Sequence, residues 1–133
     1  MVFRLGATSY GIDLGAVREI LRARPATRLP GAPKSVVGLI NVRGAIVTVI
    51  DLGVALKVRA APAGGAVMLI EHGPKLVGAM VDEVLEVQRA PDEALEPAPL
   101  DVQAGGAVRA LGTHEDGVVI VLDIHDLLSH VLA

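Results

Sequence analysis

Two aspartates are the side chains in this sequence that most resemble a catalytic pair. Asp51 and Asp123 each end an apolar run, and two carboxylates held together can act as a general acid and a general base. Each also precedes a stretch that favours a helical turn, where an aspartate accepts backbone N–H groups. Asp13 and Asp82 follow apolar runs in a similar way. We therefore expect helix caps, and a small enzyme that uses Asp51 and Asp123 stays open as an alternative.

The histidines and serines are not spaced as metal ligands or nucleophiles. His72, His114, His125 and His130 lack the spacing of a zinc-binding helix, and the chain has no cysteine to supply thiolates. No serine lies in a small-residue elbow, and no glycine-rich loop followed by lysine is present to hold a phosphate. The sequence therefore predicts no catalytic constellation, no metal site and no cofactor.

The remaining candidate is a polar turn inside the most apolar part of the chain. Residues 36–52 read VVGLINVRGAIVTVIDL, in which Asn41-Val42-Arg43-Gly44 separates two apolar runs. This pattern predicts two strands joined by a turn. Two interpretations stay open. The turn is a plain hairpin with a solvated arginine, or the guanidinium of Arg43 contacts a partner or pairs with an acid such as Glu19 to shape a binding surface.

Alternating apolar residues predict the strands that must hold this turn in place. We expect strands in residues 2–5, 10–12, 36–40, 45–50, 67–71, 75–81, 84–87, 108–111 and 118–122. Pro25, Pro30 and Pro33 predict a loop with a short extended piece at residues 27–29. Residues 88–106 carry many prolines and glycines and predict an ordered but irregular crossing loop.

Three helical segments are expected. Leu14, Val17 and Leu21 recur at helical spacing after Asp13, which places Arg18, Glu19 and Arg22 on the other side of a short helix. Residues 52–56 have room for a single turn. The apolar residues Ile124, Leu127, Leu128 and Val131 lie on one face of a C-terminal helix that Asp123 caps.

Length and composition narrow the possible functions. A chain of 133 residues without cysteine can form one domain with its own core and fits a reducing compartment. The net charge is −3 and the basic residues are scattered, so we expect no nucleic-acid partner. No signal peptide and no apolar stretch of about 20 residues is visible, so we expect a cytoplasmic protein without membrane insertion.

Two parts of the chain resemble each other at a constant offset. Each reads as strand, turn, apolar strand, aspartate and short helix, and the matching residues are Leu39 with Leu111, Val47 with Val119, Val49 with Val121, and Asp51 with Asp123. Such a duplication predicts two small barrels or half-sheets packed together, and closed barrels would remove exposed strand edges.

The order of motifs resembles the CheW family, the small adaptor proteins of bacterial chemosensory arrays. The resemblance covers nearly the whole chain. It rests on Phe3-Arg4-Leu5-Gly6, Tyr10-Gly11-Ile12-Asp13, Val17 with Glu19-Ile20, Gly38-Leu39-Ile40-Asn41-Val42-Arg43-Gly44, Val49-Ile50-Asp51-Leu52, Val77-Gly78, Val81-Asp82-Glu83-Val84 and Val121-Leu122-Asp123-Ile124. The motif from Gly38 to Gly44, followed by the aspartate, is its most specific part.

The resemblance implies a mainly β fold and a scaffolding role. It implies a single domain, residues 1–133, made of two SH3-like five-stranded β-barrels side by side with short helices, one of them C-terminal. We expect subdomain 1 at roughly residues 13–66, and subdomain 2 at roughly residues 1–12 plus 67–133. The implied partners are the cytoplasmic tip of a chemoreceptor and the regulatory domain of a CheA-type histidine kinase, which would hold the protein at receptor arrays on the inner face of the membrane. No enzymatic activity is implied.

The resemblance also implies binding residues. Receptor or kinase contacts are carried over to Val17, Glu19, Gly38, Arg43 and Val87, and we add Asn41 and Gly44 of the same turn and Val84 of a matching motif. An apolar groove between the barrels would receive the receptor's helical hairpin.

The chain departs from the family pattern at three positions. Thr48 replaces a proline, Gly53 a basic residue and Ala110 a glycine, and these changes bear on partner choice more than on fold. These departures fit a divergent chemosensory system that controls gliding or pilus motility. A regulatory barrel of a kinase or of a CheV-like protein is the close alternative.

Overall fold

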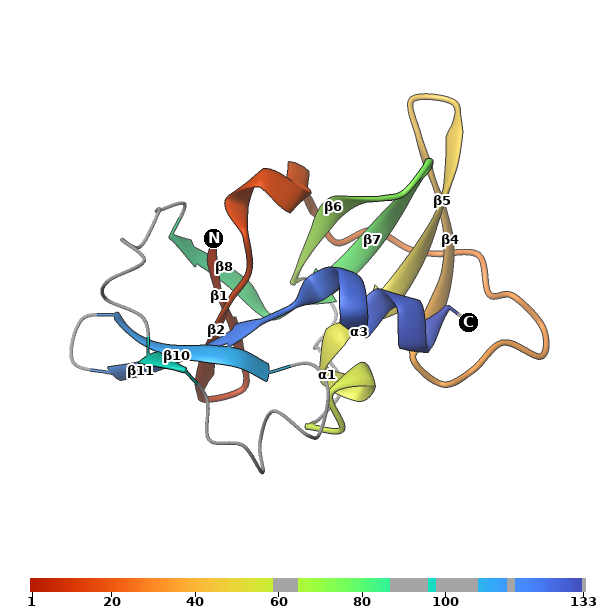
Figure 1. Cartoon of the computed structure of the whole chain (residues 1–133). Helices are drawn as coiled ribbons and strands as arrows, with labels where there is room; N and C mark the ends of the chain where they lie inside the picture. The colour runs from red at the N-terminus through yellow and green to blue at the C-terminus, as the bar shows by residue number, and fades with distance from the viewer. Residues whose placement is uncertain (59–64, 87–95, 98–107, 115–116, 133) are drawn as a thin grey trace.

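The described strands form two β-sheets, one of six strands and one of five. The computed structural model describes residues 1–58, 65–86, 96–97, 108–114 and 117–132 (Figure 1). The hydrogen-bonded order is β8-β1-β2-β11-β10-β9 in the larger sheet and β3-β6-β7-β5-β4 in the smaller one. The fold is therefore mainly β, as predicted, with a few short helices.

The elements follow one another through short turns in most of the described chain. In chain order they are β1 (Val2–Leu5), β2 (Thr8–Gly11), the 3₁₀ helix η1 (Leu14–Ala16), β3 (Val17–Arg22), β4 (Val36–Val42), β5 (Ala45–Asp51), α1 (Leu52–Ala55), β6 (Ala66–His72), β7 (Lys75–Val81), β8 (Glu83–Glu86), β9 (Glu96–Pro97), β10 (Val108–His114), β11 (Gly117–Leu122) and α3 (Ile124–Val131).

The strand registers confirm the predicted duplication. In the β4–β5 hairpin Leu39 is opposite Thr48, and 72 residues later in the β10–β11 hairpin Leu111 is opposite Ile120. Both hairpins have a register shift at the same place, near the start of the first strand. Both also continue into a parallel neighbour, because β5 pairs with β7 and β11 pairs with β2. The two units are therefore one structure built twice.

Each sheet takes its middle hairpin from the other half of the chain. The β1–β2 hairpin lies beside the late strand β11, and the β6–β7 hairpin lies between β3 and β5. Residues 66–81 therefore belong to the five-stranded sheet, whereas the expected division assigned residues 67–133 to the second subdomain. The cause is the long-range pairing of β6 with β3 and of β7 with β5. The division into two subdomains itself stays a prediction.

The five-stranded sheet is buried on both faces. Along β6, Met68 and Ile70 point into a cluster shared with the six-stranded sheet, whereas Val67 and Leu69 point into a second cluster on the opposite face. The shared cluster also contains Phe3 from β1 and residues of α3, the helix that Figure 1 shows below the strands of the five-stranded sheet. This packing explains the continuous apolar runs of β5 and β6.

The predicted helix after Asp13 was wrong. Only Leu14–Ala16 is helical, and the chain then forms the strand β3. Asp13 does cap the short helix, since its Oδ1 accepts from the backbone N–H of Gly15 at 3.0 Å. A nine-residue helix is marginal alone, and pairing with β6 gives the β-branched residues Val17 and Ile20 a better place in a sheet.

The other local predictions have mixed outcomes. The helical turn after Asp51 and the C-terminal helix are confirmed, and an isolated bridge between Thr27 and Leu39 supports the short extended piece. Most of the crossing loop at residues 88–106 lies outside the described residues. Closed five-stranded barrels are not confirmed, because one sheet has six strands and no described ladder joins the edge strands β3 and β4 of the other.

Candidate functional site

The β4–β5 hairpin ends in a two-residue turn made of Arg43 and Gly44. Val42 is opposite Ala45, and both turn residues have positive φ, 50° for Arg43 and 88° for Gly44. This is the type I′ pattern, which favours Asn, Asp and Gly because they tolerate positive φ. The Oδ1 of Asn41 accepts from the backbone N–H of Gly44 at 2.8 Å and holds the turn closed. Figure 1 shows this hairpin extending beyond the rest of its sheet.

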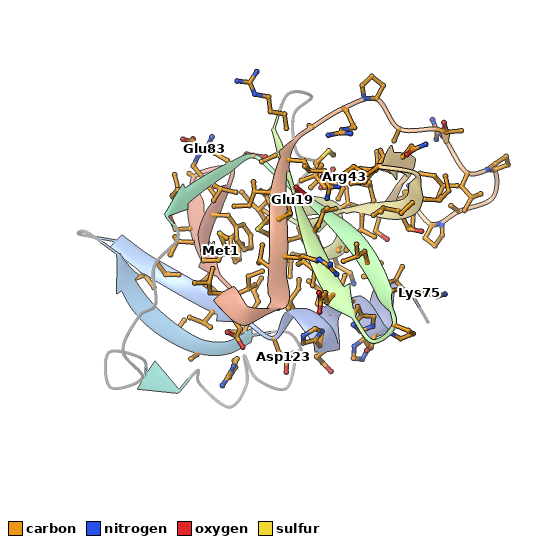
Figure 2. The ribbon with its side chains drawn as sticks, turned by 90° about the horizontal axis from the view of Figure 1, so that it is seen from above. Met1, Glu19, Arg43, Lys75, Glu83 and Asp123 are labelled. Carbon is orange, nitrogen blue, oxygen red and sulfur yellow. The ribbon has the colours of Figure 1, made fainter. Side chains whose placement is uncertain are left out.

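The guanidinium of Arg43 forms a two-pronged ion pair with Glu19. Its Nη1 donates to Oε1 at 3.0 Å, and its Nη2 donates to Oε2. Glu19 lies on β3 and Arg43 follows β4, so the pair connects the two edge strands of the five-stranded sheet. Figure 2 shows the two side chains side by side, far from Asp123. Of the interpretations left open by the sequence, the pairing of Arg43 with Glu19 is the one that the structure shows.

The ion pair is exposed, and it shifts the pKa values of both partners. The hydrogen bond from Arg43 lowers the pKa of Glu19, and the positive charges of Arg43, Arg18 and Arg24 lower it further. The same hydrogen bond raises the pKa of Arg43. The side chain of Arg43 is 70% exposed and that of Glu19 is 34% exposed. Because water screens such pairs, this one contributes little to folding and mainly fixes the direction of the guanidinium.

Gly38 has a structural reason to be glycine. A Cβ at this position would lie 2.3 Å from the carbonyl oxygen of Thr27, and its φ of 152° is one that other residues rarely adopt. Thr27 and Leu39 exchange two backbone hydrogen bonds of 2.8 Å across this point. Gly38 therefore lets the chain after β3 approach β4. A direct contact of Gly38 with a partner stays a prediction.

The other predicted binding residues do not all lie at the hairpin. Asn41 and Gly44 belong to the turn, whereas Val17 and Val84 are half-buried and pack against the shared core. Val84 is opposite Phe3 in the six-stranded sheet. Val87 lies outside the described residues. The structure thus brings Glu19, Arg43, Asn41 and Gly44 together and leaves Val84 elsewhere.

Sequence reasoning missed an exposed apolar side chain beside the turn. Ile46 is opposite Asn41 and is 67% exposed, although it lies in a run that is otherwise largely buried. Its counterpart in the second unit, Val118, is 61% exposed. Alternation could not have found it, because Ile50 lies on the same face of the strand and is fully buried; only the place of Ile46 next to the turn could have indicated exposure.

The two candidate catalytic aspartates are helix caps. Asp51 Oδ1 accepts from the N–H of Val54 at 3.2 Å, and Asp123 Oδ1 accepts from the N–H of Asp126 at 3.1 Å. They belong to different structural units, as their places after β5 and β11 show. The expected capping role is confirmed.

The remaining polar clusters of the described chain offer no other chemistry. Its His, Asp and Glu side chains include no group of three that could hold a metal ion. His72 and His125 meet through their Nδ1 atoms at 3.3 Å and join β6 to α3. In the part of the chain that is described, every helix is too short or too polar to cross a bilayer.

Comparison with known proteins places this geometry in a family. The CheW-like domain matches residues 1–132. The chain belongs to the CheW-like domain family. It is 33% identical to the chemotaxis protein CheW of Klebsiella aerogenes over 133 residues, which covers 97% of this chain and 80% of that protein. It is 34% identical to a probable chemotaxis protein CheW of Rhizobium etli over 101 residues, 74% of this chain and 65% of that protein.

A solved CheW structure shows the same fold. The crystal structure of the scaffolding protein TtCheW from Thermoanaerobacter tengcongensis has a TM-score of 0.84 and 29% sequence identity, covering 96% of this chain and 89% of that one. The CheW-like family is one of non-enzymatic adaptors in bacterial chemotaxis. Membership therefore decides against the enzyme alternative for Asp51 and Asp123.

Proposed function

We propose that this protein is an adaptor that couples the cytoplasmic tip of a chemoreceptor to the regulatory domain of a CheA-type histidine kinase. Family membership supports a chemotaxis scaffold, and the proposal adds the two partners. The protein would work in the cytoplasm and reach receptor arrays through these partners. It would hold them in place and take no part in phosphoryl transfer itself.

The backbone of Arg43 is the observation that carries this proposal. A type I′ turn is best served by Asn, Asp or Gly, so an arginine with a φ of 50° is unfavourable for the turn. Its side chain is largely exposed and contributes little to folding through its ion pair. A residue that is unfavourable for the turn and unimportant for the core is best explained by contact with another molecule.

The geometry suggests how Arg43 would bind. A guanidinium has five N–H donors, and the pair with Glu19 engages only its Nη1 and Nη2 groups. The remaining donors belong to an exposed side chain that the ion pair already orients, which lowers the entropy cost of binding. The exposed Ile46 adds apolar area beside them. A partner that offers a carboxylate or a backbone carbonyl next to an apolar side chain would match this surface.

The half-buried valines mark a second part of the proposed binding surface. Val17 and Val84 pack against the shared core at the strands β3 and β8. An apolar receptor helix would pack against the edge strands that carry these valines, as in helix-in-groove recognition. We also infer that the five-stranded sheet rolls into an SH3-like barrel. The Thr27–Leu39 bridge supports this, because it connects the chain after β3 to the opposite edge strand β4.

Binding measurements with a matched control test the proposal. The Arg43→Ala variant is compared with Arg109→Ala, because Arg109 is an exposed arginine of β10 in the six-stranded sheet, outside the hairpin site. Calorimetric titration with the kinase regulatory domain and with a receptor cytoplasmic fragment is expected to show at least tenfold weaker binding of one partner for Arg43→Ala only. If the unmodified protein bound neither partner at high micromolar concentration, the adaptor proposal would be wrong.

A further inference from the structure

Charge is distributed very unevenly along this chain. Six of its 12 Lys and Arg residues lie between Val17 and Ile50, together with only one of its 15 acidic residues, Glu19. All six are exposed. They are Arg18, Arg22, Arg24, Arg28, Lys34 and Arg43, and we call their side chains the basic surface. The expectation that the basic residues are scattered was therefore wrong.

The fold places these side chains along the edge strand β3, the chain that follows it, and the turn after β4. Arg18 and Arg22 lie on the exposed side of the edge strand β3, where every second residue is exposed. The chain then turns toward the other edge strand, because Thr27 pairs with Leu39 of β4. Arg24 donates from Nη1 to the carbonyl oxygen of Asn41 at 3.4 Å, next to the turn that carries Arg43. The basic surface therefore continues directly into the hairpin site.

Four of the six cations form no ion pair with an acid in the described part of the chain. Arg43 pairs with Glu19 and Arg18 with Glu71, but within the described residues Arg22, Arg24, Arg28 and Lys34 form no ion pair. Like charges gathered in this way repel one another and attract an acidic surface through solvent.

The composition of the surface favours a protein over a nucleic acid as the occupant. Five of its six cations are arginine, the cation enriched in protein interfaces, and the exposed apolar residues Ile20 and Leu29 lie among them. Single-stranded nucleic acids are bound through exposed aromatic rings, but the only Phe and Tyr of the chain are buried against each other.

The segment that carries the surface is also stiffened for binding. Pro25, Pro30 and Pro33 restrict the backbone between β3 and β4, so less conformational entropy is lost when a partner binds. We propose that the basic surface docks onto a cluster of Asp and Glu on a protein partner, as a second contact beside the Arg43 hairpin. This inference rests on the proposed adaptor function, since the partner would be the kinase or the receptor.

A pair of charge-reversal variants tests the inference. The Arg22→Glu, Arg28→Glu, Lys34→Glu triple variant removes charge from the basic surface. A control triple variant, Lys57→Glu, Lys75→Glu, Arg109→Glu, changes three exposed basic residues elsewhere and has the same net charge. Each full chain is titrated with the kinase regulatory domain and with the receptor fragment at about 0.05 M and about 0.5 M salt, because the Debye length shrinks severalfold over this range. Circular dichroism checks that both variants fold.

The expected result is a loss that depends on position and on salt. The first variant should bind one of the two partners at least tenfold more weakly at low salt and nearly normally at high salt, whereas the control should stay within about twofold of the unmodified protein.

Equal binding by both variants would overturn the inference and leave the adaptor function intact. Binding of a duplex DNA as tight as that of the protein partners, or salt-sensitive self-association in sedimentation, would assign the surface to another occupant and also overturn it. Failure of the unmodified protein to bind either partner would instead remove the adaptor function on which the inference rests.

Discussion

The two duplicated units of this protein share their framework but not their surface chemistry. The unit β4–β5–α1 and the unit β10–β11–α3 have the same strand register, the same register shift and a parallel neighbour on the same strand. In each unit an aspartate between the second strand and the helix caps that helix. Each unit also exposes one apolar residue, Ile46 or Val118, near the end of its hairpin. Everything that the two units share therefore serves folding or presents a simple apolar contact.

The differences lie where partner binding is proposed. Where the first unit has Gly38, Asn41, Arg43 and Gly44, the sequence of the second unit has Ala110, Thr113, Glu115 and Asp116. The chain after β3 explains why position 38 is a glycine, because a Cβ there would lie 2.3 Å from the carbonyl oxygen of Thr27. The comparison separates the framework features that appear twice from Asn41, Arg43 and Gly44, which appear once and for which partner binding is proposed.

The largest expected effect comes from a glycine of the first unit that the second unit lacks. Gly38→Ala should lower the free energy of unfolding by about 3 kcal/mol, because the new Cβ would clash with the Thr27 carbonyl at a positive φ. The reciprocal Ala110→Gly change should cost only about 0.5–1 kcal/mol. Urea unfolding measures both. Equal losses would contradict the view that only the first unit needs a close chain approach.

A smaller effect is expected at a glycine of the strand that pairs in parallel with each unit. Gly78 is opposite Val49, and Gly11 is opposite Val121. A Cβ at Gly78 would lie 2.9 Å from Val67 Cγ1 and 3.1 Å from Val49 Cγ2, whereas at Gly11 the nearest atom is 3.2 Å away. Gly78→Ala should therefore cost about 2 kcal/mol and Gly11→Ala less than about 1 kcal/mol in thermal unfolding. The reverse order would show that the two sheets are packed less alike than their registers indicate.

The shared aspartates should contribute to stability in both units and to activity in neither. Replacing Asp123 by Ala should cost about 1 kcal/mol and replacing Asp51 by Ala up to about 2 kcal/mol, because Asp51 is buried and Asp123 is exposed. A double Asp51→Asn, Asp123→Asn variant keeps both caps and should retain partner coupling. Loss of coupling in a folded double variant would restore the enzyme alternative.

The sequence predicted what depends on neighbouring residues and missed what depends on distant ones. The caps at Asp51 and Asp123 and the turn at Arg43 follow from local patterns. The pairing of Arg43 with Glu19 stayed one of several open interpretations, because it joins two separate strands. The helix expected after Asp13 failed because β6, some 50 residues later, supplies a strand partner for Val17. The subdomain boundary expected near residue 66 does not coincide with the division into sheets, for the same reason. No local signal shows that the β6–β7 hairpin enters the sheet of the first unit.

The smallest expected effect is on the stability contributed by the Arg43–Glu19 pair, which has no counterpart in the second unit's sequence. Because the hydrogen bond from Arg43 lowers the pKa of Glu19, the pair's contribution is fully present above the unfolded-state pKa and is lost as the pH falls through the folded one. Nuclear magnetic resonance titration of the Glu19 carboxyl should show this pKa rising toward its ordinary value in Arg43→Gln. Unfolding measured at neutral pH should hardly change, because the pair is exposed. A loss of several degrees in the melting temperature would instead make Arg43 a structural residue. It would contradict the view that the residues found only in the first unit's turn serve partner binding.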